Sequence, residues 1–392
     1  MSLLSGSTGL SVFRVGGIST PEEILAGLIC NPFAELSGAR ARDELSVGFV
    51  DYFDMTETCF DSVEKIRIDD AVVFAVRIDT KKIPAKVMQI ELAEAHEDFL
   101  SRNTGLKFVP KAEREAIRDQ VKGRLLEKVL PTPKLIHVVW RIADNELLVD
   151  TVTKSTLEWV AKLLHDSFPT LELSLVTPID RAMLINPRAL EMNKAQTASI
   201  LEKVEANAFY WREFLAWILW RTYNTDSRYA VHATGPLLYN QPFTAFADKK
   251  IVLSGDISGE RKKMTVSGLG SRLPEVQSGL AEGLAVDSMT IILHIDDDTQ
   301  FSVTVDGQWL AMAGLKVPAI RIERDPNDDP IAERQAAFID RLGLIGEARQ
   351  MLDSLLFDYL AMRNGSSGEY TVFLAAFVEW TCGHKEGESR DD

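Results

Sequence analysis

The sequence predicts an α+β protein in which antiparallel sheets are flanked by helices and a helical hairpin protrudes. Segments rich in valine, isoleucine and phenylalanine follow one another, and pairs of helices separate these runs. The regular strand–helix–strand rhythm of a parallel sheet is absent from the pattern. The chain has 392 residues, 46% of them apolar and 26% charged, which is enough for one large core or two to three smaller ones.

The first eighty residues predict a strand, a helix and a meander. Residues 10–15 alternate as a short strand does, and a helix then opens at Thr20-Pro21-Glu22-Glu23. There Thr20 caps the helix, Pro21 takes the first helical position and Glu23 completes a capping box. After a loop, an antiparallel meander is predicted from the strands 45–53, 63–68 and 71–79.

Helical spacing of apolar residues begins at Pro84 and predicts a helical hairpin. Its helices span 84–102 and 110–129, and the turn Asn103-Thr104-Gly105 joins them. The elements expected next are strands over 135–142 and 146–151, a helix over 154–167 and a strand over 171–176.

The second half of the chain predicts a helical, aromatic-rich region followed by a sheet and a long helix. The expected elements are helices within 179–224, a strand at 250–256, a helix near 272–282, strands at 287–295 and 300–306, and a helix at 330–363. Two apolar runs, 214–220 and 372–380, are about half the ~20 residues that span a membrane, so they predict buried helices. The aromatic block 209–220 is expected to form core or a dimer surface, with base stacking as the alternative.

These patterns divide the chain into six expected regions. They are an N-terminal sheet region (1–80), a basic helical hairpin (81–133), a central α/β region (134–180), a helical aromatic-rich region (181–248), a C-terminal sheet and helix region (249–365) and a C-terminal extension (366–392).

Composition narrows the function classes. The net charge of −15 argues against a chain that is basic throughout, but phosphate binding depends on where lysine and arginine gather. Cys30, Cys59 and Cys382 show no metal-binding or disulfide spacing, and no secretory signal is evident, so a cytoplasmic protein with reduced thiols is expected. Without a P-loop, GxSxG or HExxH motif, the sequence calls for no cofactor and no resident metal.

The second hairpin helix carries the main candidate site. Its region contains seven cations: Lys107, Lys111, Arg114, Arg118, Lys122, Arg124 and Lys128. Residues 111, 114, 118 and 122 share one side at i, i+3/i+4 spacing, while the acidic residues are expected mainly on other faces. Such a row suits a phosphate backbone and is indifferent to base identity. The alternative is a solvated helix face with ion pairs.

Two further basic groups are candidates. Lys81, Lys82 and Lys86 stand at the junction between strand and helix. Arg261-Lys262-Lys263 follows Gly259 in an expected loop, where it either touches a phosphate backbone or serves as a solubilising turn.

His294, Asp296 and Asp298 suggest a metal site, because alternate residues of a strand share a face and carboxylates bind Mg²⁺. The simpler interpretation is turn chemistry, since Asp296-Asp297-Asp298-Thr299 separates two strands.

Several segments in register resemble the RdgC family. They are Lys82-Ile83-Pro84-Ala85-Lys86-Val87, the basic helix 110–121, Leu125-Leu126 with Pro131, Val138-Val139-Trp140 with Leu147-Leu148-Val149-Asp150, Arg212-Glu213-Phe214-Leu215-Ala216-Trp217, Leu280-Ala281-Glu282-Gly283, the strands ending at Val305-Asp306, and Gly314-Leu315-Lys316-Val317-Pro318. The resemblance covers about residues 10–360.

The resemblance implies a horseshoe-shaped subunit that closes into a dimeric ring with basic residues lining the hole. Such a ring binds double-stranded DNA without sequence preference, is associated with the nucleoid and restrains the recombinase RecA. The expected phosphate contacts are Lys82, Lys86, Lys111, Arg114, Arg118, Lys122, Arg261, Lys262 and Lys263. No enzymatic activity is expected. The alternatives are a metal-dependent DNA exonuclease using His294, Asp296 and Asp298, and a protein-interaction scaffold with a merely solvated basic helix.

Overall fold

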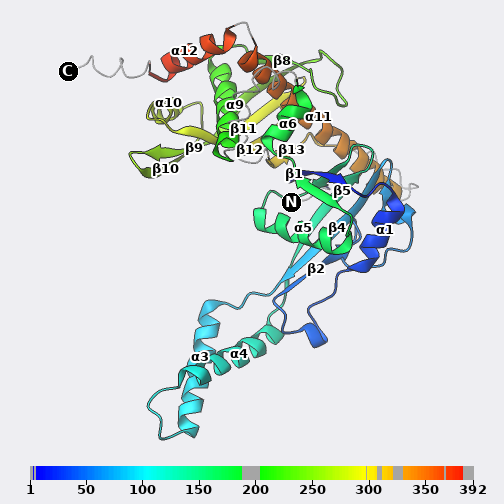
Figure 1. Ribbon diagram of the computed structural model, residues 1–392, viewed down its shortest axis with the longest axis vertical. Helices are drawn as coiled ribbons and strands as arrows, with labels where there is room; N and C mark the ends of the chain where they lie inside the picture. The colour runs from blue at the N-terminus through cyan, green and yellow to red at the C-terminus, as the bar shows by residue number, and fades with distance from the viewer. Residues whose placement is uncertain are drawn as a thin grey trace, which may run out of the picture. The chain divides into compact units, whose positions relative to one another are not determined.

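A computed structural model describes residues 3, 6–187, 204–296, 298–306, 311–320, 330–365 and 368–382. The chain forms two compact units (Figure 1). Unit 1 comprises Met1–Arg14, Leu148–Thr153 and Leu173–Asp392, and unit 2 comprises Val15–Leu147 and Lys154–Glu172. Each unit combines antiparallel strands with helices, so the predicted α+β class is confirmed.

Unit 2 is built on a small antiparallel sheet in the order β5-β4-β2, with β3 also paired to β4. Its elements are α1 (Pro21–Cys30), the 3₁₀ turn η1 (Gly38–Arg40), β2 (Leu45–Val50), α2 (Val63–Ile66), β3 (Arg67–Ile68), β4 (Ala71–Thr80), α3 (Ala85–Arg102), α4 (Lys111–Lys128), β5 (Thr132–Arg141) and α5 (Lys154–Ser167). The strand β6 (Glu146–Val149) follows β5 and begins in this unit.

The core of unit 2 is aromatic. Phe49 of β2 meets Phe74 of β4 edge to face at 5.5 Å between ring centroids, and Phe168, just after α5, lies 5.7 Å from Trp140. Helix α1 begins with the predicted capping box: the Thr20 side chain accepts the Glu23 N–H, and Glu23 accepts the Thr20 N–H. The helix therefore starts at Pro21, as predicted.

The predicted helices over 84–102 and 110–129 are present as α3 and α4, and they contact each other. Both are inserted between β4 and β5. In Figure 1 they lie beyond the end of the sheet where β2 begins and β4 ends. Helix α3 has no buried residue, and α4 buries only Val121, Leu125 and Leu126, all near its C-terminal end. The first half of α4 therefore gains little from packing.

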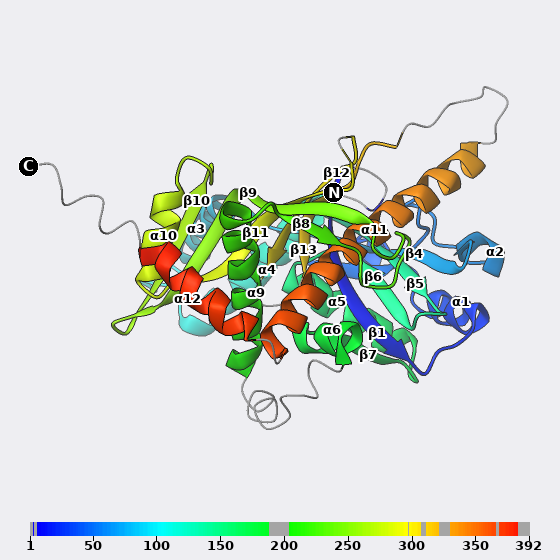
Figure 2. The same cartoon turned by 90° about the horizontal axis from the view of Figure 1, so that it is seen from above.

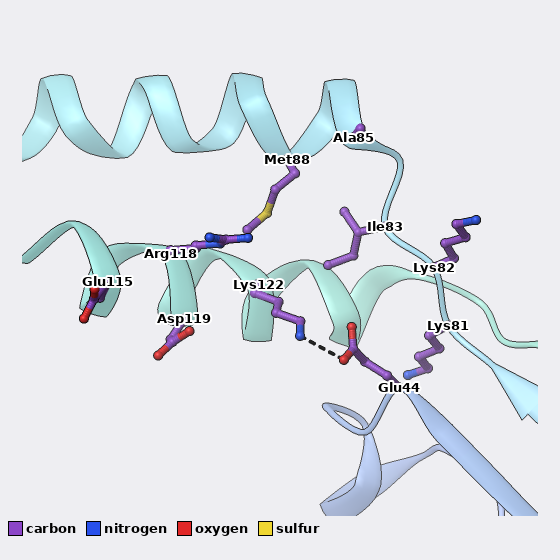
Figure 3. Close-up of a pocket in the computed structure, with 10 residues that line it drawn as sticks. All are labelled: Glu44, Lys81, Lys82, Ile83, Ala85, Met88, Glu115, Arg118, Asp119 and Lys122. Atoms are coloured by element: carbon purple, nitrogen blue, oxygen red, sulfur yellow. Dashed lines mark hydrogen bonds and ion pairs between the residues drawn. The ribbon is translucent and has the colours of Figure 1, made fainter. Parts of the chain in front are cut away.

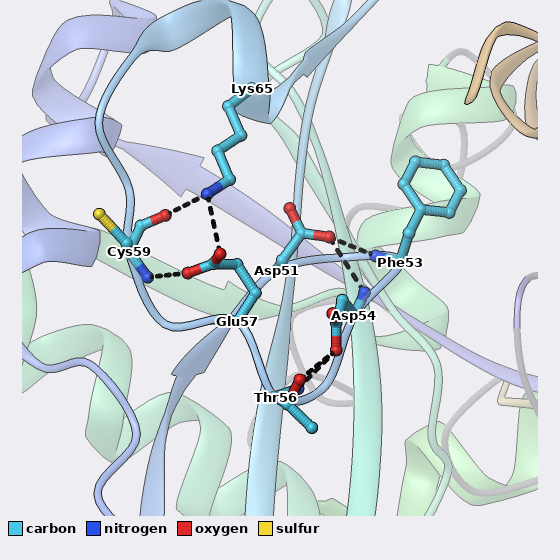
Figure 4. Close-up of polar contacts among 7 residues, drawn as sticks. All are labelled: Asp51, Phe53, Asp54, Thr56, Glu57, Cys59 and Lys65. Atoms are coloured by element: carbon cyan, nitrogen blue, oxygen red, sulfur yellow. Dashed lines mark hydrogen bonds and ion pairs between the residues drawn. The ribbon is translucent and has the colours of Figure 1, made fainter. Parts of the chain in front are cut away.

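The strand predicted at 63–68 is wrong for its first four residues, which form α2. The preceding loop explains the difference (Figure 4). Asp51 accepts the N–H groups of Phe53 and Asp54, and Asp54 accepts that of Thr56. From α2, Lys65 reaches back to the Cys59 carbonyl oxygen at 2.6 Å and to Glu57 at 3.7 Å. These side-chain bonds close the loop and favour a helical turn, an option that strand patterning does not register.

Unit 1 contains a larger antiparallel sheet in the order β10-β9-β11-β12-β13-β1, with β8 on β9 and β7 on β1. Its elements are β1 (Ser7–Gly16), β7 (Glu172–Leu175), α6 (Pro178–Ile185), α9 (Val204–Asn224), β8 (Arg228–Ala230), β9 (Pro242–Ile257), β10 (Glu260–Ser267), α10 (Leu273–Ala281), β11 (Ala285–His294), β12 (Gln300–Asp306), β13 (Met312–Lys316), α11 (Pro330–Asn364) and α12 (Glu369–Cys382). Strands β8 and β13 lie outside the predicted set of elements.

Helices cover one face of this sheet, as Figure 2 shows for α9, α11 and α12. Helix α9 packs on β9 and β11, and α11 and α12 pack in turn on α9 and on each other. The aromatic block supplies the interface: Trp211, Phe214 and Trp217 are buried, and Phe214 lies 5.5 Å from Tyr359 of α11. The prediction of a buried helix at 214–220 is confirmed, and core is the role of these three side chains. The side chains of 209 and 210 lie outside the described part.

The second apolar run, 372–380, is helical but not buried as predicted. Within α12, Phe373 is buried, whereas Val372 and Val378 are 69% and 58% exposed. Apolar composition predicts the helix, but α12 packs against other elements along only one side. The three cysteines are free and exposed. In the part of the chain that the structure describes, none of the helices has the length and apolarity that crossing a membrane requires.

A glycine on α1 tests the aromatic core. A Cβ at Gly27 would lie 1.9 Å from Cε1 of Phe168, whose ring is 2% exposed and packed against Trp140. Gly27→Ala should therefore lower the free energy of unfolding of unit 2 by about 1–3 kcal/mol, measured by urea denaturation.

The control is Gly123→Ala on α4, where the new Cβ would make an ordinary 3.5 Å contact with Arg42. Relief of glycine's backbone entropy should make that change neutral or stabilising by up to about 1 kcal/mol. Equal stability of the two variants would contradict the packing shown here.

Candidate functional site

The junction between β4 and α3 is fixed by one buried lysine. Lys81 is 6% exposed, and its ammonium donates to the carbonyl oxygens of Ala41 at 2.7 Å and Leu126 at 2.9 Å. Its backbone N–H donates to the carbonyl oxygen of Glu44 at 2.9 Å. Leu126 is in the last turn of α4, where carbonyls lack helical partners and a cation is favourable. Lys81 therefore ties the sheet, the η1 loop and α4 together.

The neighbouring lysines have a different environment. Because the backbone is extended here, Lys82 points away from the Lys81 anchor and is exposed, as Figure 3 shows. Lys86, in the first turn of α3, is also exposed. Within the described ranges neither makes a hydrogen bond or ion pair, so both ammonium groups are open to a ligand.

The first half of α4 presents exposed cations. Lys111, Arg114 and Arg118 are exposed, and each lacks an ion pair among the residues that the structure describes. At 1.5 Å rise per residue they follow one another over roughly 10 Å along the same side of the helix. The predicted row is therefore present for these three side chains.

The second half of α4 is neutralised by carboxylates. Lys122 lies 2.8 Å from Oε2 of Glu44, and Arg124 pairs with Glu91 of α3. In the reverse sense, Glu127 of α4 pairs with Arg42 at 2.6 Å. Lys122 thus differs from the three cations before it on α4, because its charge is shared with a carboxylate 78 positions away. Packing brings this half of the helix against the body of the unit, where acidic side chains reach it.

A pocket of about 610 Å³ lies where these elements meet (Figure 3). It is lined by Glu44, Lys81, Lys82, Ile83, Ala85, Met88, Glu115, Arg118, Asp119 and Lys122. Its charged lining comprises four cations and three carboxylates. Sequence spacing places Glu115 and Asp119 mainly on other faces of the helix. They nevertheless line the same pocket as Arg118, so acidic and basic side chains are less separated than expected.

The second basic cluster lies in a strand and not in the predicted loop. Strand β9 runs to Ile257, the turn is formed by Ser258 and Gly259 with φ of 56° and 83°, and β10 begins at Glu260. A two-residue turn of positive φ suits a tight hairpin, which leaves no loop for the cations. Arg261, Lys262 and Lys263 are exposed and stand opposite Asp256, Gly255 and Ser254.

Strand geometry also divides this cluster. Alternate residues point to opposite faces, so Arg261 and Lys263 share one face of β10 and Lys262 lies on the other. The three cations therefore do not form one patch, and they belong to unit 1, whereas the row on α4 belongs to unit 2.

Around Asp296, residues 295–296 and 298–299 have the hydrogen bonds of a turn between β11 and β12, as the simpler interpretation predicted. Asp296 Oδ1 accepts the N–H groups of Asp298 at 3.0 Å and Thr299 at 2.7 Å. A hydrogen bond with the Thr299 side chain, together with these two backbone bonds, lowers the pKa of Asp296. The ring of His294 stacks on Phe246 at 5.6 Å between centroids. Asp297 lies outside the described residues. Among those that are described, no three His, Cys, Asp or Glu side chains are grouped to hold a metal ion.

Residues 9–185 match the model of one protein family, described as "RdgC: Putative exonuclease, RdgC". Over these 177 of its 392 residues the chain is similar to the RdgC family. The match contains the β4–α3 junction, α3, α4 and β5, so the candidate site lies wholly inside it. The resembling segments beyond residue 185 lie outside the match and stay predictions. No curated protein matches the chain. This similarity supports a recombination-associated role related to nucleic acids.

Two residues of the site were not predicted. Glu44 lies in what the sequence shows only as a loop, and its ion pair with Lys122 depends on the tertiary fold. Lys81 was grouped with the other junction lysines, although burial gives it a structural role. The extended backbone expected before Pro84 indicates a difference between these lysines, because successive side chains such as Lys81 and Lys82 then point to opposite sides.

Substitution at the junction separates the two lysines. Lys81→Met removes both hydrogen bonds of the buried ammonium and leaves two carbonyl oxygens without that donor. It should therefore lower the free energy of unfolding by about 1–3 kcal/mol in urea denaturation. Lys82→Met removes the same charge from an exposed position and should change stability by less than about 0.5 kcal/mol. Equal losses would show that Lys81 is not the anchor.

Proposed function

We propose that this chain binds double-stranded DNA through the phosphate backbone, without reading the base sequence. The observation that carries the proposal is the row of exposed cations on α4, Lys111, Arg114 and Arg118, which lack ion pairs among the described residues. Each cation that neutralises a phosphate releases condensed counterions, and this gain does not depend on the base pair. Lys82 and Lys86 extend the surface at the junction with β4, and Lys122 joins it when its pair with Glu44 opens.

The alternative of a merely solvated helix face fits only the second half of α4. A solvated face is stabilised by ion pairs with neighbours, which is what Lys122 and Arg124 form. Glu113, Glu115 and Asp119 accompany the cations in sequence but make no ion pair with them in the described part of the chain. Leaving three cations unpaired in a chain of net charge −15 favours an external anion as their partner.

We further propose that the chain acts as a homodimer that closes around the duplex and restrains RecA-dependent recombination by occupying DNA. In support, apolar side chains are exposed close to the cations. Phe108 and Leu106, in the loop between α3 and α4, are 76% and 43% exposed. Neighbouring exposed apolar residues are typical of a surface that another chain covers, and a second copy supplies the same apolar surface. Residues 261–263 stay less direct candidates for phosphate contact.

The proposed role is binding and not catalysis. The family description names an exonuclease, so a metal-dependent nuclease is the second candidate. Of the carboxylates considered for it, Asp296 already accepts hydrogen bonds from two backbone N–H groups of its own turn. A two-metal nuclease centre needs carboxylates that converge from several elements.

Removing the unpaired row should abolish most duplex binding. We expect Lys111→Ala, Arg114→Ala and Arg118→Ala together to weaken affinity on the order of 10²-fold at low salt. The slope of log K against log salt should also become shallower by about 2.7, at 0.9 per phosphate contact. Fluorescence anisotropy with duplexes of unrelated sequence, in chelator, measures both quantities.

The matched control removes three cations that already have carboxylate partners: Arg40, Arg42 and Arg124, which pair with Asp43, Glu127 and Glu91. It changes the net charge equally within the same unit, so it should retain most of the affinity. Equal losses in the two triple variants would show that net charge, and not the row on α4, governs binding.

The nuclease alternative has its own test. End-labelled duplex incubated with Mg²⁺ or Mn²⁺, with and without chelator, should stay full length under the binding proposal. Metal-dependent shortening that disappears in Asp296→Asn would establish the enzyme instead. Shortening that persists in that variant points to a contaminating nuclease or to a different catalytic site, which a second purification distinguishes.

A further inference from the structure

We propose that the pocket beside α4 is a subsite for one backbone phosphate, and that the Glu44 carboxylate occupies it when no DNA is bound. This inference rests on the proposed duplex binding and adds a residue that opposes it. It commits to a phosphodiester oxygen as the ligand of Lys122, in the position that Glu44 Oε2 now holds.

The first step is the state of each cation in the pocket. Lys81 is engaged by two carbonyl oxygens and is not available to a ligand. Lys82 and Arg118 have no partner among the described residues. Among the residues that the structure describes, Glu44 is the one ion-pair partner of Lys122, at 2.8 Å (Figure 3). Once Glu44 is displaced, the Lys122 ammonium is open to an anionic oxygen, and Arg118 and Lys82 also line the pocket.

The second step is the position of Glu44. Its backbone carbonyl accepts the Lys81 N–H at 2.9 Å, and Leu45 directly after it opens β2. The residue is therefore fixed at the pocket wall while its side chain remains 53% exposed. The other two carboxylates of the pocket, Glu115 and Asp119, are carried by α4 itself and make no ion pair within the described ranges. Glu44 is thus the acidic group that holds a pocket cation.

The third step is the strength of the pair that must break. Lys122 is 42% exposed and Glu44 53% exposed, so water screens their attraction. A carboxylate oxygen and a phosphate oxygen accept the same kind of charge-assisted hydrogen bond from an ammonium group. Exchange of one acceptor for the other is therefore close to balanced, and release of counterions from DNA favours the phosphate. After exchange, the displaced carboxylate stays near the phosphate and repels it.

Glu44 should consequently lower affinity without abolishing it. Glu44→Gln keeps the shape of the side chain and removes its charge. We expect duplex affinity to rise roughly threefold to tenfold at low salt, with a salt slope steeper by up to about one contact. Anisotropy titrations over a range of salt measure both changes, and an unchanged melting temperature shows that the fold is intact.

Two comparisons make the test specific. Glu127→Gln removes an equal charge from a pair on the same helix, Arg42–Glu127, whose members do not line the pocket. It should change affinity by less than twofold. In a double-mutant cycle, the gain from Glu44→Gln should vanish when Lys122→Met is also present.

The outcomes separate this inference from the proposed function. If the wild-type chain binds duplex and Glu44→Gln gives no gain, or the same gain as Glu127→Gln, the subsite is overturned and DNA binding stands. A gain that persists alongside Lys122→Met overturns the role of the Lys122–Glu44 pair. If neither the wild type nor Glu44→Gln binds duplex, both the proposed function and this inference fail.

Discussion

The candidate surface depends on one buried charge. Lys81 is 6% exposed, and the burial of its charge is tolerated because two carbonyl oxygens accept hydrogen bonds from its ammonium group. Those oxygens belong to different segments of the chain. Lys81 therefore sets the distance between the end of the sheet, the η1 loop and the last turn of α4. This anchor also fixes two residues beside it. Lys82 follows it in the chain and is directed outward, and Glu44, whose carbonyl oxygen accepts the Lys81 N–H, is held at the pocket wall. The buried Lys81 thus positions the exposed Lys82 and the carboxylate of Glu44, which competes with a ligand for Lys122.

Packing also decides which cations of α4 are neutralised. The helix buries Val121, Leu125 and Leu126, and the same turns come within reach of Glu44 and Glu91. The preceding turns bury nothing and meet no such carboxylate in the described structure. Burial and ion pairing are therefore two consequences of one contact between α4 and the body of unit 2. Because the buried residues of α4 lie in its second half, its unpaired cations lie in the first half.

Much of the fold was predictable because its signals are local. The capping box at Thr20 and Glu23 and the apolar spacing that predicts α4 each involve residues that are close in sequence. Predictions failed where a contact between two neighbouring segments decides, because the residue pattern of one segment does not show that contact. Val63–Ile66 is helical because Lys65 bonds back to the preceding loop, and Arg261–Lys263 pairs in a strand because β9 continues to Ile257. For the site, helical spacing identified the cations of α4, but no spacing relates Glu44 to Lys122, 78 positions apart.

A net charge of −15 opposes the binding of a polyanion, but screening limits this repulsion. At physiological salt the Debye length is about 8 Å, so carboxylates on distant surfaces contribute little to the potential at α4. A carboxylate 2.8 Å from Lys122 is inside that length, so dissolved salt does little to screen it from the same ammonium that a phosphate would bind. Affinity for an anion is then governed by local pairing and not by the total. In such a chain, the few carboxylates that lie close to the cations of α4 matter more than the many that do not, and Glu44 is the one that pairs with Lys122 in the described structure.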